Sequence, residues 1–271
     1  MSSIPFDIVG FDLDGTLIDT SGDLAAAVNH AIGTIGRDPF PAADIRPFAG
    51  KGARVMLQRA LDASGGCDTA MLADLLPILL DHYAQNLAIH STPYPGAVQA
   101  LDALAARGVR IALCTNKAER FTIPLMQQIG LHDRFAAIVS GDTVGVSKPD
   151  PAPIRAMIER AGGGRAIFVG DTINDIAGAR NAGIANIAVG FGFLDGPVEE
   201  VCGMVSDWDV YVNKDLPEAV WGRLKERGFF GMVIPQDYGG LGFSATAHSA
   251  GVGKMASRSI PLSITVMVPN S

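Results

Sequence analysis

The chain of 271 residues is long enough for one large domain or two smaller ones. Its hydrophobic fraction of 48% and charged fraction of 18% exclude an intrinsically disordered protein. The formal charge of −7 argues against a nucleic-acid partner and against an anionic membrane surface. Cys67, Cys114 and Cys202 form no CxxC pair, which suits a reducing compartment and argues against structural zinc. Without a basic leader or an apolar run of membrane-spanning length, we expect a cytoplasmic protein.

The first 92 residues begin with one strand and continue with helices. The apolar run at residues 6–11 predicts a buried strand of a parallel sheet. Apolar residues at helical spacing then predict helices over 21–36, 53–63 and 69–87. Because no further buried strand appears in this part, we expect residues 17–92 to form a helical cap inserted after the first strand.

From residue 93 onward, strands and helices alternate regularly. Buried apolar runs predict strands over 109–114, 137–140, 166–169 and 185–189. Helical spacing predicts helices over 97–106, 118–129, 151–161 and 174–182. This repetition predicts an α/β fold, with a doubly wound, Rossmann-like parallel sheet formed by residues 1–16 and 93–192.

The end of the first strand carries two carboxylates two residues apart, Asp12 and Asp14, followed by Gly15 and Thr16. Open α/β sheets bind their ligands at the carboxyl edge, where this strand ends. Because two like charges this close repel each other, the pair is best explained by a bound cation. The alternative is an Asx-type turn after an edge strand, which explains one aspartate and the glycine but not the second aspartate with the threonine.

Polar residues also follow the later strands. Thr115 and Asn116 come after the strand at 109–114, where a hydroxyl and the first N–H groups of a helix can bind an oxyanion. Thr115 taken alone is more often a helix cap. Lys148 precedes two prolines, which limit where its side chain can point. A lone loop lysine is usually solvated, but a rigid one at this edge can neutralise phosphate charge.

Asp171 follows the strand at 166–169, and Asp175 lies four residues further on. The position of Asp175 suits the outer shell of a metal site or the orientation of Lys148. Each segment by itself is weak evidence. Their order along the chain is informative, because consecutive parallel strands bring their carboxyl ends to one edge of the sheet.

In this order the motifs resemble those of phosphatases of the haloacid dehalogenase superfamily, over about residues 4–192. The segments at 94–97, 113–117, 148–153 and 168–172 are similar in particular to bacterial phosphoglycolate phosphatases. The resemblance implies that Asp12 is the nucleophile and Asp14 the general acid and base. It further implies that Thr115 and Lys148 hold the phosphoryl group.

The same resemblance implies substrate contacts from Thr16 and Asn116. It implies a Mg²⁺ cofactor bound by the Asp12 carboxylate, the Asp14 backbone carbonyl and Asp171, with Asp175 in support. The expected partner is a small phosphorylated metabolite, without nucleic acid or membrane, and the chain is expected to be a monomer or a homodimer.

The sequence indicates the substrate less directly than it indicates the reaction. Lys51 and Arg54 lie where a closing cap would meet the site, and either would suit the carboxylate of 2-phosphoglycolate. A solvated helix start is the alternative for these two cations. Asp14 argues against dehalogenation, which needs no second acid. Another small phosphate ester, a phosphomutase reaction and a catalytically weak scaffold protein remain alternatives.

The C-terminal part does not continue the βα pattern. Residues 228–242 resemble the N-terminal helical region of acyl-CoA dehydrogenases, and the similarity extends over about residues 193–271. A piece of this length lacks that family's flavin-binding domain and its catalytic carboxylate. We therefore expect a mostly helical extension without dehydrogenase activity, whether it arose as a natural fusion, a cloning junction or a chimera.

Overall fold

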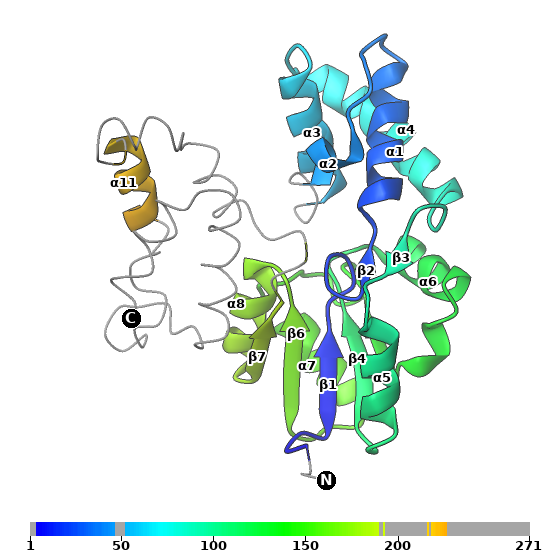
Figure 1. Ribbon diagram of the computed structural model, residues 1–271, viewed down its shortest axis with the longest axis vertical. Coiled ribbons are helices and arrows are strands. Elements are labelled where there is room, and N and C mark those ends of the chain that lie inside the picture. The colour runs from blue at the N-terminus through cyan, green and yellow to red at the C-terminus, as the bar shows by residue number, and fades with distance from the viewer. Residues whose placement is uncertain (1–3, 47–51, 190–191, 193–215, 217, 227–271) are drawn as a thin grey trace. The chain divides into compact units, whose positions relative to one another are not determined.

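The computed structural model describes residues 4–46, 52–189, 192, 216 and 218–226 (Figure 1). The chain divides into two compact units, residues 1–193 and 194–271. Each unit is described by itself.

A five-stranded sheet forms the centre of the first unit, with the strand order β5-β4-β1-β6-β7. All neighbouring strands in it are parallel. The strands are β1 (Ile8–Phe11), β4 (Arg110–Cys114), β5 (Ala137–Val139), β6 (Ala166–Gly170) and β7 (Ala185–Ala188). The first strand lies in the middle and pairs on both sides, so the chain reverses its winding direction at β1.

Alternate residues of each strand face opposite layers, because successive side chains of a strand point to opposite faces of the sheet. Val9 and Leu113 pack in one cluster with side chains of α5 and α6, whereas Ile8 and Phe168 pack in another with α7 and α8. These four helices are α5 (Ala97–Ala105), α6 (Glu119–Gln128), α7 (Ala152–Arg160) and α8 (Ile173–Ala182), and a short η2 (His132–Arg134) precedes β5. The predicted doubly wound sheet is thus confirmed.

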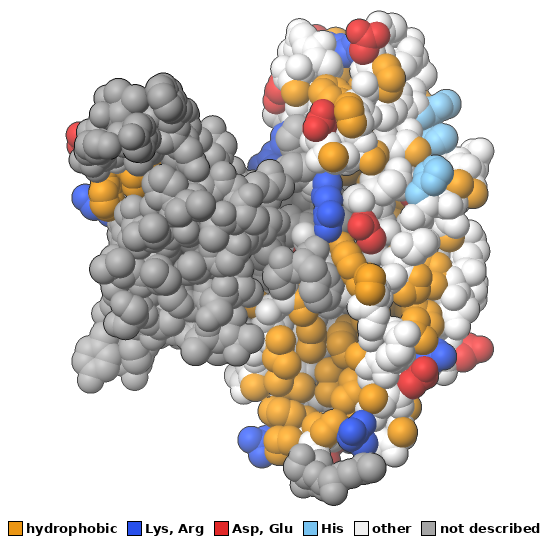
Figure 2. Space-filling view, in the orientation of Figure 1, with side chains coloured by type: hydrophobic (Ala, Val, Ile, Leu, Met, Phe, Trp, Pro, Cys, Tyr) orange, Lys and Arg blue, Asp and Glu red, His pale blue; other side chains and the backbone are white. Residues whose placement is uncertain are grey.

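In chain order, four helices come between β1 and α5, and Figure 1 shows them gathered beyond the carboxyl ends of the strands. They are α1 (Ser21–Gly33), α2 (Ala42–Ile45), α3 (Ala53–Ala63) and α4 (Thr69–Gln85). Among them α1 and α4 pack against each other, and the rings of His30 on α1 and His82 on α4 stack with centroids 4.2 Å apart. Figure 2 shows pale-blue histidine side chains on the surface of this part of the molecule. The short α2 is an addition to the elements that helical spacing predicts.

Two short strands connect these helices with the sheet. β2 (Ile18–Asp19) leads out and β3 (Thr92–Pro93) leads back, and the two pair antiparallel. Just beyond them, the buried carboxylate of Asp23 accepts hydrogen bonds from the backbone N–H groups of His90 and Ser91 and from the Ser91 hydroxyl. The start of α1 is therefore tied to the returning segment.

In the second unit, α11 (Glu218–Glu226) is the helix that the structure describes, within the extension that was expected to be mostly helical. Val220 and Leu224 are buried four residues apart on one face of α11, and Leu216, which precedes the helix, is buried as well. The remainder of the extension, including the stretch at 228–242, lies outside the described residues.

The described helices do not include one with both the length and the hydropathy that a membrane crossing requires. On the face drawn in Figure 2, the visible basic and acidic side chains are interspersed.

We predict that Asp23→Ala lowers the free energy of unfolding by about 2–4 kcal/mol, because it leaves the buried N–H and hydroxyl groups of Ser91 and the partly buried N–H group of His90 without their acceptor. Urea denaturation, followed in the near-ultraviolet, measures the change. The matched control is Asp81→Ala on α4, where the side chain is exposed, with an expected effect within about 0.5 kcal/mol. Equal effects of the two substitutions would contradict this account.

Candidate active site

The strand register brings the predicted site residues to one edge of the sheet. Phe11 is level with Leu113 of β4 on one side and with Val169 of β6 on the other. Asp12, Thr115 and Asp171 therefore follow three adjacent strands at nearly the same height. Tertiary structure thus joins residues that are more than a hundred positions apart in the chain.

The loop after β1 reverses direction within a few residues. The Leu13 carbonyl accepts hydrogen bonds from the N–H groups of Thr16, Leu17 and Ile18. Gly15 has φ of 86°, a left-handed conformation that other residues rarely adopt, so a glycine is required for this turn. The turn separates the two carboxylates, and Asp12 is buried while Asp14 keeps a partly exposed side chain.

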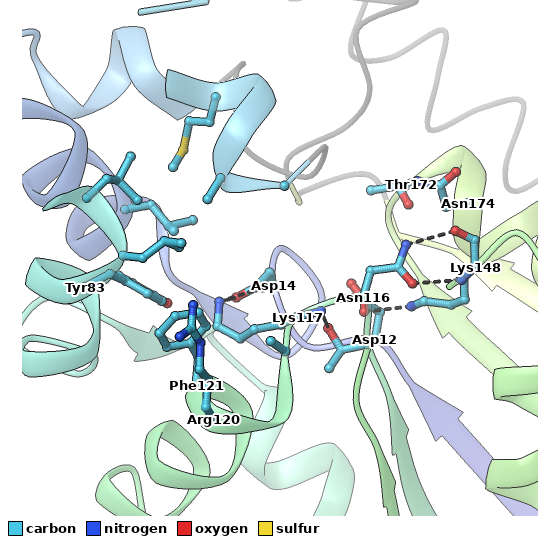
Figure 3. Close-up of a pocket in the computed structure, with 18 of the residues that line it drawn as sticks. Asp12, Asp14, Tyr83, Asn116, Lys117, Arg120, Phe121, Lys148, Thr172 and Asn174 are labelled. Atoms are coloured by element: carbon cyan, nitrogen blue, oxygen red, sulfur yellow. Dashed lines mark hydrogen bonds and ion pairs between the residues drawn. The ribbon is translucent and has the colours of Figure 1, made fainter. Parts of the chain in front are cut away.

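Lys148 is the cation at the centre of the site. Its ammonium group, in a side chain with an exposed fraction of only 2%, donates to Asp12 Oδ1 at 2.8 Å, to the Cys114 carbonyl at 2.7 Å and to Asp175 Oδ1 (Figure 3). Burial opposes the charge on Lys148, but the carboxylates of Asp12 and Asp175 outweigh it and raise the pKa of the lysine above its ordinary value. The lysine is therefore held protonated beside the nucleophile candidate.

For Asp12, in contrast, the effect of burial on the pKa outweighs the effect of the neighbouring opposite charge. Burial raises the pKa of its carboxyl group from 3.8 to about 7, and Lys148 only partly offsets this effect. Asp175 and Asp14 also raise the pKa because they add negative charge. Additional positive charge at this point would favour the ionised form of Asp12.

Asn116 holds the segment that carries Lys148. Its side-chain amide donates to the Lys148 carbonyl at 2.9 Å, and its amide oxygen accepts from the Lys148 N–H at 2.8 Å. Both polar atoms of the amide are thus engaged with the backbone. The sequence-based prediction assigned Asn116 to the substrate, whereas its contacts here indicate that it positions Lys148.

Three buried carboxylates form a cluster beside this lysine. Oxygen atoms of Asp12, Asp171 and Asp175 lie within 4.8 Å of one another. Thr16, a predicted substrate contact, instead donates its hydroxyl to Asp171 Oδ1 at 3.0 Å. Carboxylate oxygens are the ligands that Mg²⁺ and Ca²⁺ prefer, so the cluster fits a hard divalent cation.

Asp175 has two further contacts that belong to the fold. Its Oδ2 atom accepts from the backbone N–H of Thr172 at 2.9 Å and from the Thr172 hydroxyl at 2.7 Å, as part of a capping box at the start of α8. With Oδ1 bonded to Lys148, both oxygens are occupied. These contacts agree with the orienting role that the sequence suggested for this residue.

The carboxylate of Asp14 turns away from the cluster and contacts Lys117 (Figure 3). The Lys117 ammonium group lies 2.9 Å and 2.8 Å from the two oxygens, and the Thr20 hydroxyl donates to Oδ1 at 2.7 Å. Burial opposes the charge on Lys117, but Asp14 offsets it and raises the pKa of the lysine. The side chain of Asp14 is thus engaged by Lys117 and Thr20, and the metal ligand that the family resemblance implies for this residue is its backbone carbonyl.

A cavity of about 310 Å³ opens beside these groups. This volume is at the low end of the range for small-molecule sites, about 300–1,000 Å³. Its walls come from both the sheet edge and the helices α1, α3 and α4. The lining residues that carry polar side chains include Asp12, Asp14, Tyr83, Thr115, Asn116, Lys117, Arg120 and Lys148.

The two cations expected from the cap are not among the described lining residues. Arg54 lies in the first turn of α3 with an exposed side chain, while its neighbours Gly52 and Ala53 line the cavity. Lys51 lies outside the described residues.

Lys117, Arg120 and Tyr83 contribute to the cavity without having been identified from the sequence. Lys117 directly follows Thr115 and Asn116 in the sequence, so its position next to two predicted site residues could have identified it as a further one. Tyr83 lies in an otherwise apolar helical stretch, and its place at the site depends on packing.

We predict that Lys148→Met lowers the free energy of unfolding by about 3–5 kcal/mol at pH 8, because two buried carboxylates lose their shared cation. Lys148 lowers the pKa of Asp12, so its removal raises that pKa further above the unfolded value. Stability from a protonated Asp12 is lost as pH rises through the folded-state pKa. The deficit relative to wild type should therefore be smaller at pH 5.5 than at pH 8, as measured by denaturation with chelator. A deficit independent of pH would refute this electrostatic explanation.

The family model for haloacid dehalogenase-like hydrolases matches residues 6–183, and the model for the N-terminal domain of acyl-CoA dehydrogenases matches residues 198–271. A phosphoglycolate phosphatase of Agrobacterium fabrum is 44% identical over 197 residues, which cover 70% of this chain and 83% of that protein. A phosphoglycolate phosphatase of Caulobacter vibrioides is 35% identical over 214 residues, covering 78% and 89%.

Solved structures agree with this similarity. The crystal structure of a predicted phosphoglycolate phosphatase from Haemophilus somnus is 30% identical, with a TM-score of 0.64, and the match covers 70% of this chain and 88% of that one. Residues 6–183, which the family model matches, include Asp12, Lys148 and Asp171 of the sheet edge. The chain belongs to the haloacid dehalogenase-like hydrolase family.

Proposed function

We propose that this chain is a Mg²⁺-dependent phosphomonoester hydrolase that acts through an aspartyl-phosphate on Asp12, with 2-phosphoglycolate as its substrate. The observation that carries the proposal is the buried Lys148 ammonium group shared between Asp12 and Asp175 at the edge where Thr115 and Asp171 also lie. The names of the relatives support the choice of substrate.

In the first step, a carboxylate oxygen of Asp12 attacks phosphorus in line, and the bond from phosphorus to the ester oxygen breaks. Lys148 and Thr115 hold the phosphoryl oxygens and stabilise the charge that they carry. Asp14 donates a proton to the departing alkoxide, which leaves as glycolate. The substrate's phosphoryl group is then bonded to Asp12.

In the second step, water attacks phosphorus while Asp14 accepts one of its protons. The bond between phosphorus and Asp12 breaks, which releases inorganic phosphate and restores the carboxylate. Lys117 and Thr20 keep the Asp14 carboxylate in place between these two transfers.

Asp12 and Asp171 would hold Mg²⁺ through their carboxylates, the Asp14 backbone carbonyl would complete the protein ligands, and Asp175 would support them. When bound, the ion would supply positive charge that offsets repulsion between Asp12 and the phosphate. Helices α1–α4, within residues 17–92, would act as the cap that covers the cavity.

We predict that Asp12→Asn lowers kcat on 2-phosphoglycolate by roughly 10³-fold or more, because an amide is a poor nucleophile. The measurement is phosphate release from 2-phosphoglycolate and a panel of small phosphate esters, with Mg²⁺ and with chelator. Arg54→Gln is the control and should retain activity, since its side chain is exposed and does not line the cavity. Absence of release from every ester by folded wild-type protein would refute the proposed function.

We also predict that Mg²⁺ affinity rises about tenfold between pH 6 and pH 8. Burial raises the pKa of Asp12 to about 7, so at pH 6 a proton competes with the ion for this carboxylate. As pH rises through this pKa the competition ends, and affinity levels off. Calorimetry in two buffers of different ionisation enthalpy measures both the affinity and the released proton. Asp12→Asn should abolish the dependence, and a flat wild-type profile would contradict the prediction.

A further inference from the structure

The end of the cavity beyond Asp14 is formed by side chains of the cap helix α4 and the core helix α6. Tyr83 comes from α4, and Phe121 of α6 packs edge-on against it with ring centroids 5.4 Å apart. The Arg120 guanidinium lies over the Phe121 ring at 4.6 Å, and the Lys117 ammonium lies over the Tyr83 ring at 4.9 Å. Figure 3 shows these four side chains gathered on the Asp14 side of the cavity.

Tyr83 carries a buried hydroxyl group whose proton has no acceptor in the described parts of the chain, while the nearby Lys117 ammonium group interacts with the phenol. The residue is only 3% exposed. An unpaired buried hydroxyl is costly, and native proteins rarely leave one without a reason. Burial raises the pKa of Tyr83 to about 12, so the group is a donor throughout the neutral range.

Arg120 is an exposed residue whose side chain lines the cavity, and it has no carboxylate partner among the residues that the structure describes. Lys117, in contrast, is engaged by both oxygens of Asp14. An unpaired guanidinium beside an unpaired hydroxyl forms a set of donors without an acceptor. Such a set matches a carboxylate, which an arginine can bind through two parallel hydrogen bonds.

The remaining described wall on the cap side is apolar, with Leu24, Met56, Leu79 and Leu80. A sugar-like leaving group would present several hydroxyl groups to this surface and leave them unpaired. A short leaving group with one anionic end would place that end at the donors and its carbon beside the apolar wall. The wall therefore favours a small acid over a polyol.

We infer that the Tyr83 hydroxyl and the Arg120 guanidinium form a subsite for the carboxylate of the leaving group, on the opposite side of Asp14 from Asp12. The inference rests on the proposed function and assigns substrate specificity to two residues. In 2-phosphoglycolate a single CH₂ group separates the carboxylate from the ester oxygen. A subsite for that carboxylate has to adjoin the acid that protonates the ester oxygen, and Lys117 contacts both Asp14 and the Tyr83 ring.

The test compares 2-phosphoglycolate with 2-hydroxyethyl phosphate, an ester of similar size that carries a neutral hydroxyl in place of the carboxylate. For Arg120→Gln we expect kcat/KM on 2-phosphoglycolate to fall by roughly 10–100-fold, and for Tyr83→Phe by roughly 5–20-fold. On 2-hydroxyethyl phosphate both variants should stay within about threefold of wild type. Arg120→Lys should recover part of the loss, since it restores the charge without the paired donors.

Arg54→Gln is the matched control, because it removes an exposed arginine of the cap that does not line the cavity. Its activity on both esters should remain within about twofold of wild type. Equal losses on the two esters in Arg120→Gln and Tyr83→Phe would overturn the inference, since a merely structural role affects both substrates alike. Unchanged kcat/KM on 2-phosphoglycolate would overturn it as well.

Binding to the Asp12→Asn protein separates this inference from the proposed reaction. Calorimetry with Mg²⁺ present gives the dissociation constants of 2-phosphoglycolate and of 2-hydroxyethyl phosphate without turnover. Adding Arg120→Gln should weaken 2-phosphoglycolate selectively, by roughly tenfold. If Arg120→Gln selectively weakens binding of 2-phosphoglycolate while the wild-type chain hydrolyses no ester, the result would refute the proposed hydrolase activity and support the subsite. Equal binding of the two esters by Asp12→Asn would refute the subsite even if the wild-type chain is an active phosphatase.

Discussion

The buried ammonium group of Lys148 is the interaction on which the rest of the site depends. It contacts Asp12, Asp175 and the end of β4, and so joins three separate segments at one point. Burial of two carboxylates this close is unfavourable unless a cation lies between them. Asn116 holds the lysine's backbone, and the capping box of α8 holds Asp175. The hydrogen bonds of the local fold therefore hold Lys148 and Asp175 in place, and the charge of Lys148 in turn stabilises the buried carboxylates.

A second lysine, Lys117, holds the carboxylate of Asp14 beside this centre. Lys117 faces Asp14 and the cap residue Tyr83, whereas Lys148 faces the metal-site candidates. The two carboxylates of one short loop thus lie in different environments, one buried and one partly exposed. Such a difference in burial gives the two carboxylates the separate environments that the proposed roles of nucleophile and acid require.

The connection between the helices α1–α4 and the sheet determines what the cavity can hold. β2 pairs with β3, and Asp23 ties the start of α1 to residues 90–91. Through these contacts α4 is held where Tyr83 faces residues of α6. Helices α1–α4 thereby contribute an apolar wall with one hydroxyl, and the loops at the sheet edge contribute charged groups.

The sequence by itself determined the α/β fold and the strand ends that carry Asp12, Thr115 and Asp171. Period-two and helical spacing are local properties, and parallel strands necessarily bring their carboxyl ends to one edge. Those signals also explain why helix bounds agreed within a few residues. Only the tertiary structure decided that Asn116 and Thr16 bond to Lys148 and Asp171, that Arg54 is exposed, and that Tyr83 and Arg120 line the same cavity. The direction of a side chain toward a distant segment depends on how helices pack, and spacing along the chain carries no information about that contact.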